Sequence, residues 1–287
     1  MKSIRSLFPI HSGKAIFSVW LVCLPVFLIG QVYNVSRYTT ADNLVQSQVM
    51  ALFQDHQGYL WFGTHGGPCK YDGQNFFAIP KDSLAGNFLT DIWEDQDRNH
   101  MYFATRSGLT VFDGTTYQTI SLPGGEDPVW CMEPDGNGNL WIGTQSQGIQ
   151  IINLETRQLI QSEDHNSSPI EDRAILSIAR GDNRSFWIGT NQGVFQSSDG
   201  HILTPWKEEE IRDEVYDIFV SNSRVYFGTN QGAFLWTRRF LVRFLPTQFG
   251  GDDDGVFCFA EDREGQIWMG TRKGVLFLDN EGNVQPL

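Results

Sequence analysis

The sequence has few cysteines and no arrangement that would pair them. Its 287 residues contain 4 cysteines, and none belongs to a CxxC motif. One of them, Cys23, lies in an apolar N-terminal run. The other three are Cys69, Cys131 and Cys258, an odd number. This pattern argues against a disulfide framework and against a cysteine-based zinc site, and it favours three small buried residues.

Basic residues are also scarce. The chain has 21 Lys and Arg residues against 34 Asp and Glu residues, and its formal net charge is −13. An acidic surface repels the phosphate groups of nucleic acids and of anionic membranes. Nucleic acid is therefore excluded as a partner, whereas neutral sugars and cations are compatible with this charge.

Long apolar runs are absent after residue 31. Before it, a basic start is followed by the apolar run Ala15–Ile29, which is short for a membrane span and typical of a signal-peptide core. We predict a signal peptide over residues 1–30, with an uncleaved signal anchor as the alternative. Residues 31–287 would then be a periplasmic or otherwise exported domain, with membrane contact only through the N-terminal segment.

Motifs of hydrolytic and metal-dependent enzymes are missing. There is no HExxH and no GxSxG, and the six histidines share no register. Asp135–Asn139 resembles the first half of a calcium loop, but Leu140 and Ser146 stand where that loop needs Gly and Glu. A turn explains this segment better. We therefore predict no catalytic residues, no metal site and no cofactor.

A short motif dominates what the sequence does contain. An aromatic residue is followed by an apolar residue, Gly or Ala, and Thr, and successive threonines are 41, 39, 46, 39 and 42 residues apart. A period of about forty residues built from short β-rich runs is typical of propeller blades. We predict an all-β propeller with six recognisable blades. The six copies are Leu60–Thr64, Met101–Thr105, Leu140–Thr144, Phe186–Thr190, Val225–Thr229 and Ile267–Thr271.

The predicted strands do not balance. Val35–Thr39 reads as an outer strand that precedes the first blade, and the sixth repeat has its own outer strand beginning at Val284. Six three-stranded units would then share seven outer strands. We favour an incomplete seven-bladed ring whose last three strands lie beyond Leu287. A six-bladed ring with one redundant strand is the alternative.

The repeats resemble a known family. A strand ending in Gln-Asp or Glu-Asp, a glycine turn and the Trp-containing strand recur, most clearly over 53–64 and 260–271. Together with Tyr38–Leu44 and Tyr71–Gly73, they resemble the two-component regulator propeller repeat. The resemblance implies the periplasmic sensor of a membrane histidine kinase, often a hybrid kinase, and many such sensors respond to oligosaccharides. No second propeller, immunoglobulin-like domain or kinase segment is present in this sequence.

Candidate ligand-binding residues lie in the parts that the repeats do not share. The aromatic residue of each repeat is expected to pack between neighbouring sheets, and the threonine to hydrogen-bond within or between blades. The loops that enter each first strand would instead surround one mouth of the central channel. Aromatic residues there could stack on a sugar, with packing between blades as the alternative. The candidates are Asn87, Asp127, Trp130, Arg173, Asp213, Tyr216, Asp254 and Phe257.

Three functions fit these observations. The first is non-catalytic ligand recognition, with an oligosaccharide ligand implied by the resemblance alone. The second is a protein–protein interaction scaffold that docks a second propeller or a second copy of the chain. The third is a propeller enzyme such as a lyase or glycosidase, for which the abundant carboxylates are the only support.

Overall fold

A computed structural model describes residues 35–287, except Gly124, 161–169, 171–172, Asn183, 199–202, 208–209, 245–254 and 280–281. The chain divides into two units, Met1–Val35 and Ser36–Leu287, and the fold below is that of the second unit. The predicted signal segment, residues 1–30, lies outside the described residues. In the described part of the chain, no helix has the length and apolar character needed to cross a membrane.

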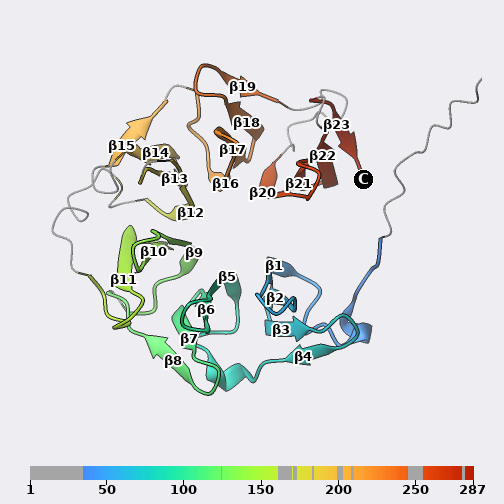
Figure 1. The fold of residues 1–287 in the computed structure, drawn as a ribbon, viewed down its shortest axis with the longest axis vertical. Helices are drawn as coiled ribbons and strands as arrows, with labels where there is room; N and C mark the ends of the chain where they lie inside the picture. Colours follow the sequence, from blue (N-terminus) through green and yellow to red (C-terminus); the bar gives the residue numbers. More distant parts are fainter. Residues whose placement is uncertain are drawn as a thin grey trace, which may run out of the picture. The chain divides into compact units, whose positions relative to one another are not determined.

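The second unit is an all-β propeller with six blades (Figure 1). The first blade contains β1 (Val49–Gln54), β2 (Leu60–Thr64), β3 (Gly67–Tyr71) and β4 (Phe76–Ala78). The second contains β5 (Leu89–Asp95), β6 (His100–Thr105), β7 (Gly108–Phe112) and β8 (Tyr117–Ile120). The third contains β9 (Val129–Pro134), β10 (Asn139–Thr144) and β11 (Ile149–Asn153).

The remaining blades follow the same order. The fourth contains β12 (Ile175–Arg180), β13 (Phe186–Thr190), β14 (Gly193–Ser197) and β15 (Leu203–Trp206). The fifth contains β16 (Val215–Ser221), β17 (Arg224–Thr229), β18 (Gly232–Trp236) and β19 (Leu241–Arg243). The sixth contains β20 (Val256–Glu261), β21 (Ile267–Thr271), β22 (Gly274–Leu278) and β23 (Val284–Pro286). Two short 3-10 helices, Thr40–Asp42 and Lys81–Ser83, lie outside the described sheets.

Each sheet is an antiparallel meander in which consecutive strands pair, so its first strand is innermost (Figure 1). The third blade departs from the prediction of a fourth strand over Gln158–Ile160. Its described sheet has three strands, and only an isolated bridge joins Ile152 to Leu159. The sixth blade does carry its own outer strand, β23, as expected.

The expected strand over Val35–Thr39 was wrong. These residues form no strand, and Thr39 instead caps the helix Thr40–Asp42 by accepting a hydrogen bond from the Ala41 N–H. The Asp42 carboxylate accepts the Thr39 N–H in return, which completes a capping box. Polar capping at this point competes with strand pairing. The premise of seven outer strands is therefore lost.

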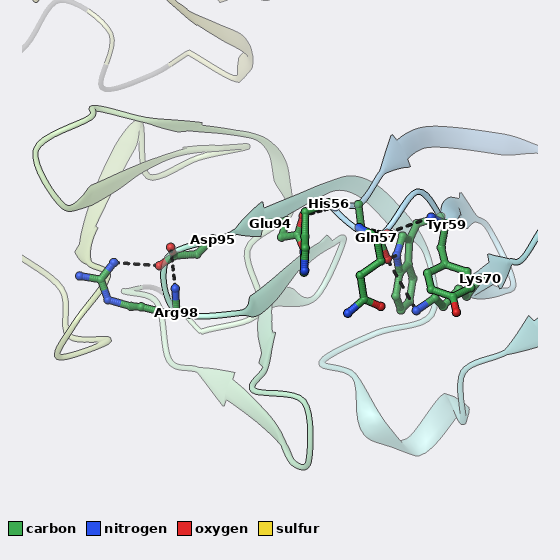
Figure 2. Close-up of polar contacts among 9 residues, drawn as sticks. His56, Gln57, Tyr59, Lys70, Glu94, Asp95 and Arg98 are labelled. Carbon is green, nitrogen blue, oxygen red and sulfur yellow. Dashed lines mark hydrogen bonds and ion pairs between the residues drawn. The ribbon is translucent and has the colours of Figure 1, made fainter.

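One turn recurs between the first and second strands of the blades. In the first blade the Asp55 carboxylate accepts the N–H groups of Gln57 and Tyr59, and its other oxygen accepts the Trp61 Nε1–H at 2.9 Å (Figure 2). Asp262 repeats this arrangement with Trp268 Nε1 at 2.8 Å. A single carboxylate thus closes the turn and orients the indole ring.

The repeat threonines also act within their own blades, as expected. Each Thr hydroxyl donates to the carbonyl of a glycine three or four residues later, which ties the second strand to the third. The six donors are Thr64, Thr105, Thr144, Thr190, Thr229 and Thr271. The sequence motif therefore encodes turn closure and strand connection, which are scaffold properties.

Blades pack through the aromatic residue of the motif. The Trp61 ring lies 5.6 Å from that of Phe103 in the next blade, and Trp141 stacks on Phe186 at 4.2 Å. Five of the six motif aromatics are buried, whereas Trp268 in the sixth blade is half-buried. The prediction that these rings fill the wedges between sheets is confirmed, since large rings bury the most apolar area where sheets diverge.

The cysteines only partly follow the prediction of buried residues. All three described cysteines are free, and Cys69 and Cys131 are buried. Cys258 is exposed, which corrects the expectation for that residue. It lies on the innermost strand of the sixth blade, and no following blade covers it in the described part of the chain.

Candidate functional site

The inner strands of all six blades line a cavity of about 530 Å³, which we call the central channel. Because each blade starts at its innermost strand, residues at equal positions of β1, β5, β9, β12, β16 and β20 lie at equal depth in it. The second residue of each strand lies near one end, called the channel mouth. These residues are Met50, Thr90, Trp130, Leu176, Tyr216 and Phe257.

Three of the predicted site residues line this channel. The rings of Tyr216 and Phe257 lie 5.0 Å apart, so the fifth and sixth blades present a paired aromatic surface. Trp130 comes from the third blade, and its Nε1–H donates to the Gln145 amide oxygen at 2.8 Å. Tyr216 donates its hydroxyl to the Glu214 carboxylate at 2.6 Å, and its pKa is raised to about 12, chiefly by burial.

Other predicted residues serve the scaffold. The Asp127 carboxylate is 6% exposed and accepts the N–H and the hydroxyl of Ser146, so it closes a loop of its own blade. Arg173 donates to the Gln192 carbonyl and lies with its guanidinium 4.8 Å above the Phe195 ring. Both side chains are thus engaged in contacts that the sequence did not reveal.

The remaining candidates are less informative. Asn87 is exposed in the segment before β5. Asp213 is half-buried, and its backbone carbonyl accepts the Gly193 N–H. Asp254 lies outside the described residues. Ligand binding by any of the eight candidates stays a prediction.

Two arginines at the mouth were missed by sequence reasoning. The Arg106 guanidinium lies 4.2 Å from the Phe88 ring centre and 5.2 Å from that of Trp130. Arg272 lies 5.6 Å from the Phe257 ring. Both directly follow the threonine of their repeat. A signal was available, because this position changes residue type from blade to blade while the threonine before it stays constant.

Deeper in the channel, carboxyl groups bridge the blades. The third residue of β5, Asp91, accepts the Met132 N–H of the next blade at 2.8 Å, and Asp217 accepts the Phe259 N–H at 2.7 Å. Burial raises the pKa of Asp91 to about 7 and that of Asp217 to about 6. Burial also raises the pKa of Glu133 to about 7. Near neutral pH these carboxyls are therefore partly protonated.

The channel carboxyls do not form a metal centre. Among the residues that the structure describes, no three His, Cys, Asp or Glu side chains are placed to hold a metal ion. The chemistry that this channel offers is aromatic stacking at the mouth, cations beside the rings and hydrogen-bonding carboxyl groups below them.

Comparison with protein families gives one match. Residues 43–66, 123–146 and 250–273 each match the two-component regulator propeller. These segments cover the first two strands of the first, third and sixth blades and the residues that lead into them. Comparison with curated proteins found no match.

Solved structures show the same fold. The extracellular domain of a putative hybrid two-component system from B. thetaiotaomicron has a TM-score of 0.75 and 20% identity over 89% of this chain. This chain spans 37% of that domain. Virginiamycin B lyase from Staphylococcus aureus has a TM-score of 0.69 and 12% identity, with 84% of both chains covered. An ancestral GH74 enzyme has a TM-score of 0.60 and 14% identity, with 83% of this chain and 37% of that enzyme covered.

These likenesses lie below 25% identity and thus establish architecture only. Sensor domains and enzymes both occur on it, which agrees with the general rule that a fold does not fix a function. The sensor likeness has additional support, since the repeat matches come from the sequence itself. This chain is a six-bladed β-propeller in which three segments match the two-component regulator propeller, and its fold is similar to that of extracellular domains of two-component systems.

Proposed function

We propose that this chain is a non-catalytic recognition propeller that acts outside the cytoplasm and binds a sugar of an oligosaccharide at the channel mouth. The observation that carries the proposal is the aromatic mouth, formed by the Tyr216–Phe257 pair and by Trp130 with Arg106 beside it. The likeness to extracellular sensor domains supports the location.

The chemistry of the mouth fits a sugar. The C–H faces of a pyranose ring pack on aromatic faces, while its hydroxyls need both donors and acceptors at the rim. Arg106 supplies donors and Glu214 supplies an acceptor beside Tyr216. A neutral sugar also avoids repulsion by the acidic chain, whose formal charge is −13.

Calorimetric titration with cellohexaose, maltohexaose and xylohexaose tests the proposal. One of these should bind, and Trp130→Ala or Tyr216→Ala should weaken its binding at least about tenfold, the loss expected for one stacking contact. Phe77→Ala is the matched control, because Phe77 is an exposed aromatic on the outer strand β4. Equal affinity in all four proteins would contradict the assignment of the mouth.

The non-catalytic part has its own test. Prolonged incubation with the bound oligosaccharide, followed by chromatography, should recover it unchanged. Cleavage that Asp217→Asn abolishes would overturn this part, since Asp217 is a channel carboxyl with a raised pKa, as general acids require. The binding assignment would survive that result.

A second candidate function, docking of another protein chain, rests on exposed apolar residues of the first and sixth blades. Val49, Met50 and Leu52 on β1 are 38%, 46% and 63% exposed, and Val275 on β22 is 41% exposed. Positions equivalent to Val49 and Leu52 are buried in blades that have a preceding blade, as at Val215 and Ile218, so these faces continue the blade–blade interface and suit a second copy of this chain. Sedimentation velocity should then show concentration-dependent assembly, which Leu52→Glu abolishes. A monomer at all concentrations would exclude it.

A further inference from the structure

The fourth blade carries the recurring turn without its carboxylate. Gly181 stands where the first blade has Asp55 and the sixth has Asp262, yet the turn closes with the same bond. The Gly181 N–H donates to the Ser185 carbonyl at 2.9 Å, against 3.0 Å for Asp55 and 3.1 Å for Asp262. The backbone is therefore preserved while the acceptor for the indole is removed.

The indole of the fourth blade is consequently left without an acceptor. Trp187 is 5% exposed, and in the described part of the chain no group accepts a hydrogen bond from its Nε1–H. A Cβ placed on Gly181 would lie 3.2 Å from this nitrogen, so the missing side chain would stand directly beside it. Trp187 also lines a cavity, so an indole N–H that no protein group accepts can donate to a ligand bound there.

A cavity of about 250 Å³ lies at this place, between the fourth and fifth blades. Trp187 lies against Gly181 in its wall, and Trp236 adds a second aromatic side chain. Ser185, Gln196 and Ser223 contribute polar groups. Val220 lines both this lateral pocket and the central channel, but none of the six mouth residues lines the lateral pocket.

The positively charged side chain of Arg238 lines the lateral pocket. Arg238, in the turn between β18 and β19, forms an ion pair with Asp182 and donates to the Ser223 hydroxyl at 3.2 Å. A guanidinium carries five N–H donors, and these contacts engage only one of its terminal nitrogens. Its other donors suit a second carboxylate, which arginine binds with charge-assisted hydrogen bonds.

We propose that the lateral pocket binds an organic carboxylate, which supplies from outside the acceptor that aspartate supplies in the first and sixth blades. One carboxylate oxygen accepts the Trp187 Nε1–H, and the other accepts from Arg238. The remainder of the ligand packs against Trp236. Two sources offer this chemistry, a uronic acid residue of a glycan and an acidic side chain of a peptide. The proposal is independent of sugar binding at the channel mouth.

Indole N–H resonances of protein labelled with 15N-tryptophan test this directly. The Trp187 signal is identified by its loss in Trp187→Phe. The probes are glucuronate and N-acetylglutamate, each paired with its neutral analogue, glucose and N-acetylglutamine. Millimolar affinity is expected for ligands of about a dozen heavy atoms, so titration to about 50 mM is sufficient. At least one carboxylate should shift the Trp187 signal saturably, with its neutral analogue at least tenfold weaker.

Variants separate this from non-specific charge effects. Gly181→Asp should abolish the shift and raise the thermal midpoint, because the new carboxylate accepts the indole N–H once the Ser185 hydroxyl has rotated away. Arg238→Ala should weaken binding at least tenfold, whereas Arg239→Ala, an exposed arginine next in the chain, should leave it unchanged. Oligosaccharide binding at the channel mouth should persist in Gly181→Asp, which keeps the two proposals distinguishable.

Three results would overturn the proposal. The first is a Trp187 signal that neither carboxylate moves, and the second is equal binding of the charged and neutral analogues. The third is undiminished binding by Arg238→Ala, a variant in an exposed turn whose folding is not at risk. A response to glucuronate alone would assign the pocket to glycans, and a response to N-acetylglutamate alone would assign it to peptides.

Discussion

The inner strand of the first blade and that of the fifth carry nearly the same pattern but have different surroundings. The leading residue of β16, Val215, is fully buried against the fourth blade, whereas its counterpart Val49 on β1 is 38% exposed. The fourth residue repeats the contrast, with Ile218 4% and Leu52 63% exposed. Similar residues at equivalent positions therefore contribute unequally to the free energy of unfolding, because their burial depends on the preceding blade rather than on the motif.

The glycine of the motif shows the same contrast on the opposite face of the blade, the face toward the following blade. A Cβ on Gly189 or Gly228 would approach a backbone carbonyl of the next blade, at 2.8 Å from Val215 and 2.7 Å from Val256. A Cβ on Gly270 of the sixth blade would meet only atoms of Cys258 within its own blade. In the described residues, the inner strand of each blade packs against the inner strand of the next blade, from β1 and β5 through to β16 and β20. In that part of the chain, no comparable packing joins β20 to β1.

Truncation of the leading valine should give the largest difference. Val215→Ala should lower the free energy of unfolding by about 2–3 kcal/mol, since it opens a cavity at a filled junction. Val49→Ala should cost less than about 0.5 kcal/mol, because a partly exposed side chain loses little burial. Urea denaturation of both variants measures this. Equal losses would show that the first blade is covered in solution and would break the comparison.

The pH dependence should follow the carboxyls at the junctions. Asp91 bridges the second and third blades, whereas the first blade has Ala51 at this position. Its pKa is raised by burial to about 7 from 3.8, so the folded state holds the proton more tightly than the unfolded state. The free energy of unfolding therefore falls as pH rises between these values.

Asp91→Asn should remove this effect. Between pH 5 and pH 8 the wild-type protein should lose about 2 kcal/mol more stability than the variant, from two pKa units of differential protonation discounted for partial exposure. Thermal or urea unfolding across this range measures it, with the exposed Asp97→Asn as control. Parallel pH profiles of Asp91→Asn and the wild type would refute the assignment.

Glycine replacement should give a smaller contrast. Gly228→Ala places a methyl group against the Val256 carbonyl, and the resulting overpacking should cost about 1–2 kcal/mol. Gly270→Ala meets only the Cys258 side chain and carbonyl, and the side chain can rotate away, so its cost should stay within about 0.5 kcal/mol. The second blade has Ala104 at the equivalent position, so an alanine there is compatible with the fold and the expected loss of stability is limited. A larger loss in Gly270→Ala would mean that another element covers the sixth blade.

The smallest effect is expected at the last turn of the inner strands, at the ends opposite the channel mouth. The Glu94 carboxylate accepts the His56 N–H at 2.8 Å and contacts His56 Nδ1 at 2.6 Å, which joins the first two blades (Figure 2). Glu94→Gln should cost about 1 kcal/mol, because one charge-assisted bond becomes neutral. Gln54, its equivalent on β1, bonds only within its own turn, so Gln54→Ala should be nearly neutral. A loss in Gln54→Ala as large as that in Glu94→Gln would remove the contrast.

Much of the fold followed from the sequence because the repeat encodes local contacts. The Thr-to-Gly bonds and the Asp55 and Asp262 turns involve residues within six positions of one another, so their spacing is readable. Strand assignment failed at Val35–Thr39, where the Thr39 capping box outweighs β propensity. It also predicted a fourth strand over Gln158–Ile160, where the structure has only an isolated bridge between Leu159 and Ile152.

The candidate site was predictable only in part. Trp130, Tyr216 and Phe257 were identified because they share one strand position, and they do line the channel. The contact of Asp127 with Ser146, 19 residues away, has no signal in a single sequence, and neither does that of Arg173 with Phe195. Gly181 was also overlooked, because the loss of a carboxylate matters only once the neighbouring Trp187 and the cavity beside it are placed.

The sequence by itself determined the six-fold repeat, the blade meander and the identity of the packing aromatics, since these depend on residues close together in the chain. Only the tertiary structure decided which copies of the same residue are buried, as at Val215 and Val49, and which carboxyls have a raised pKa. It also decided where a cavity opens between blades. The physical reason is that burial, desolvation and cavity shape arise from neighbouring blades, which lie about forty residues away and leave no periodic mark.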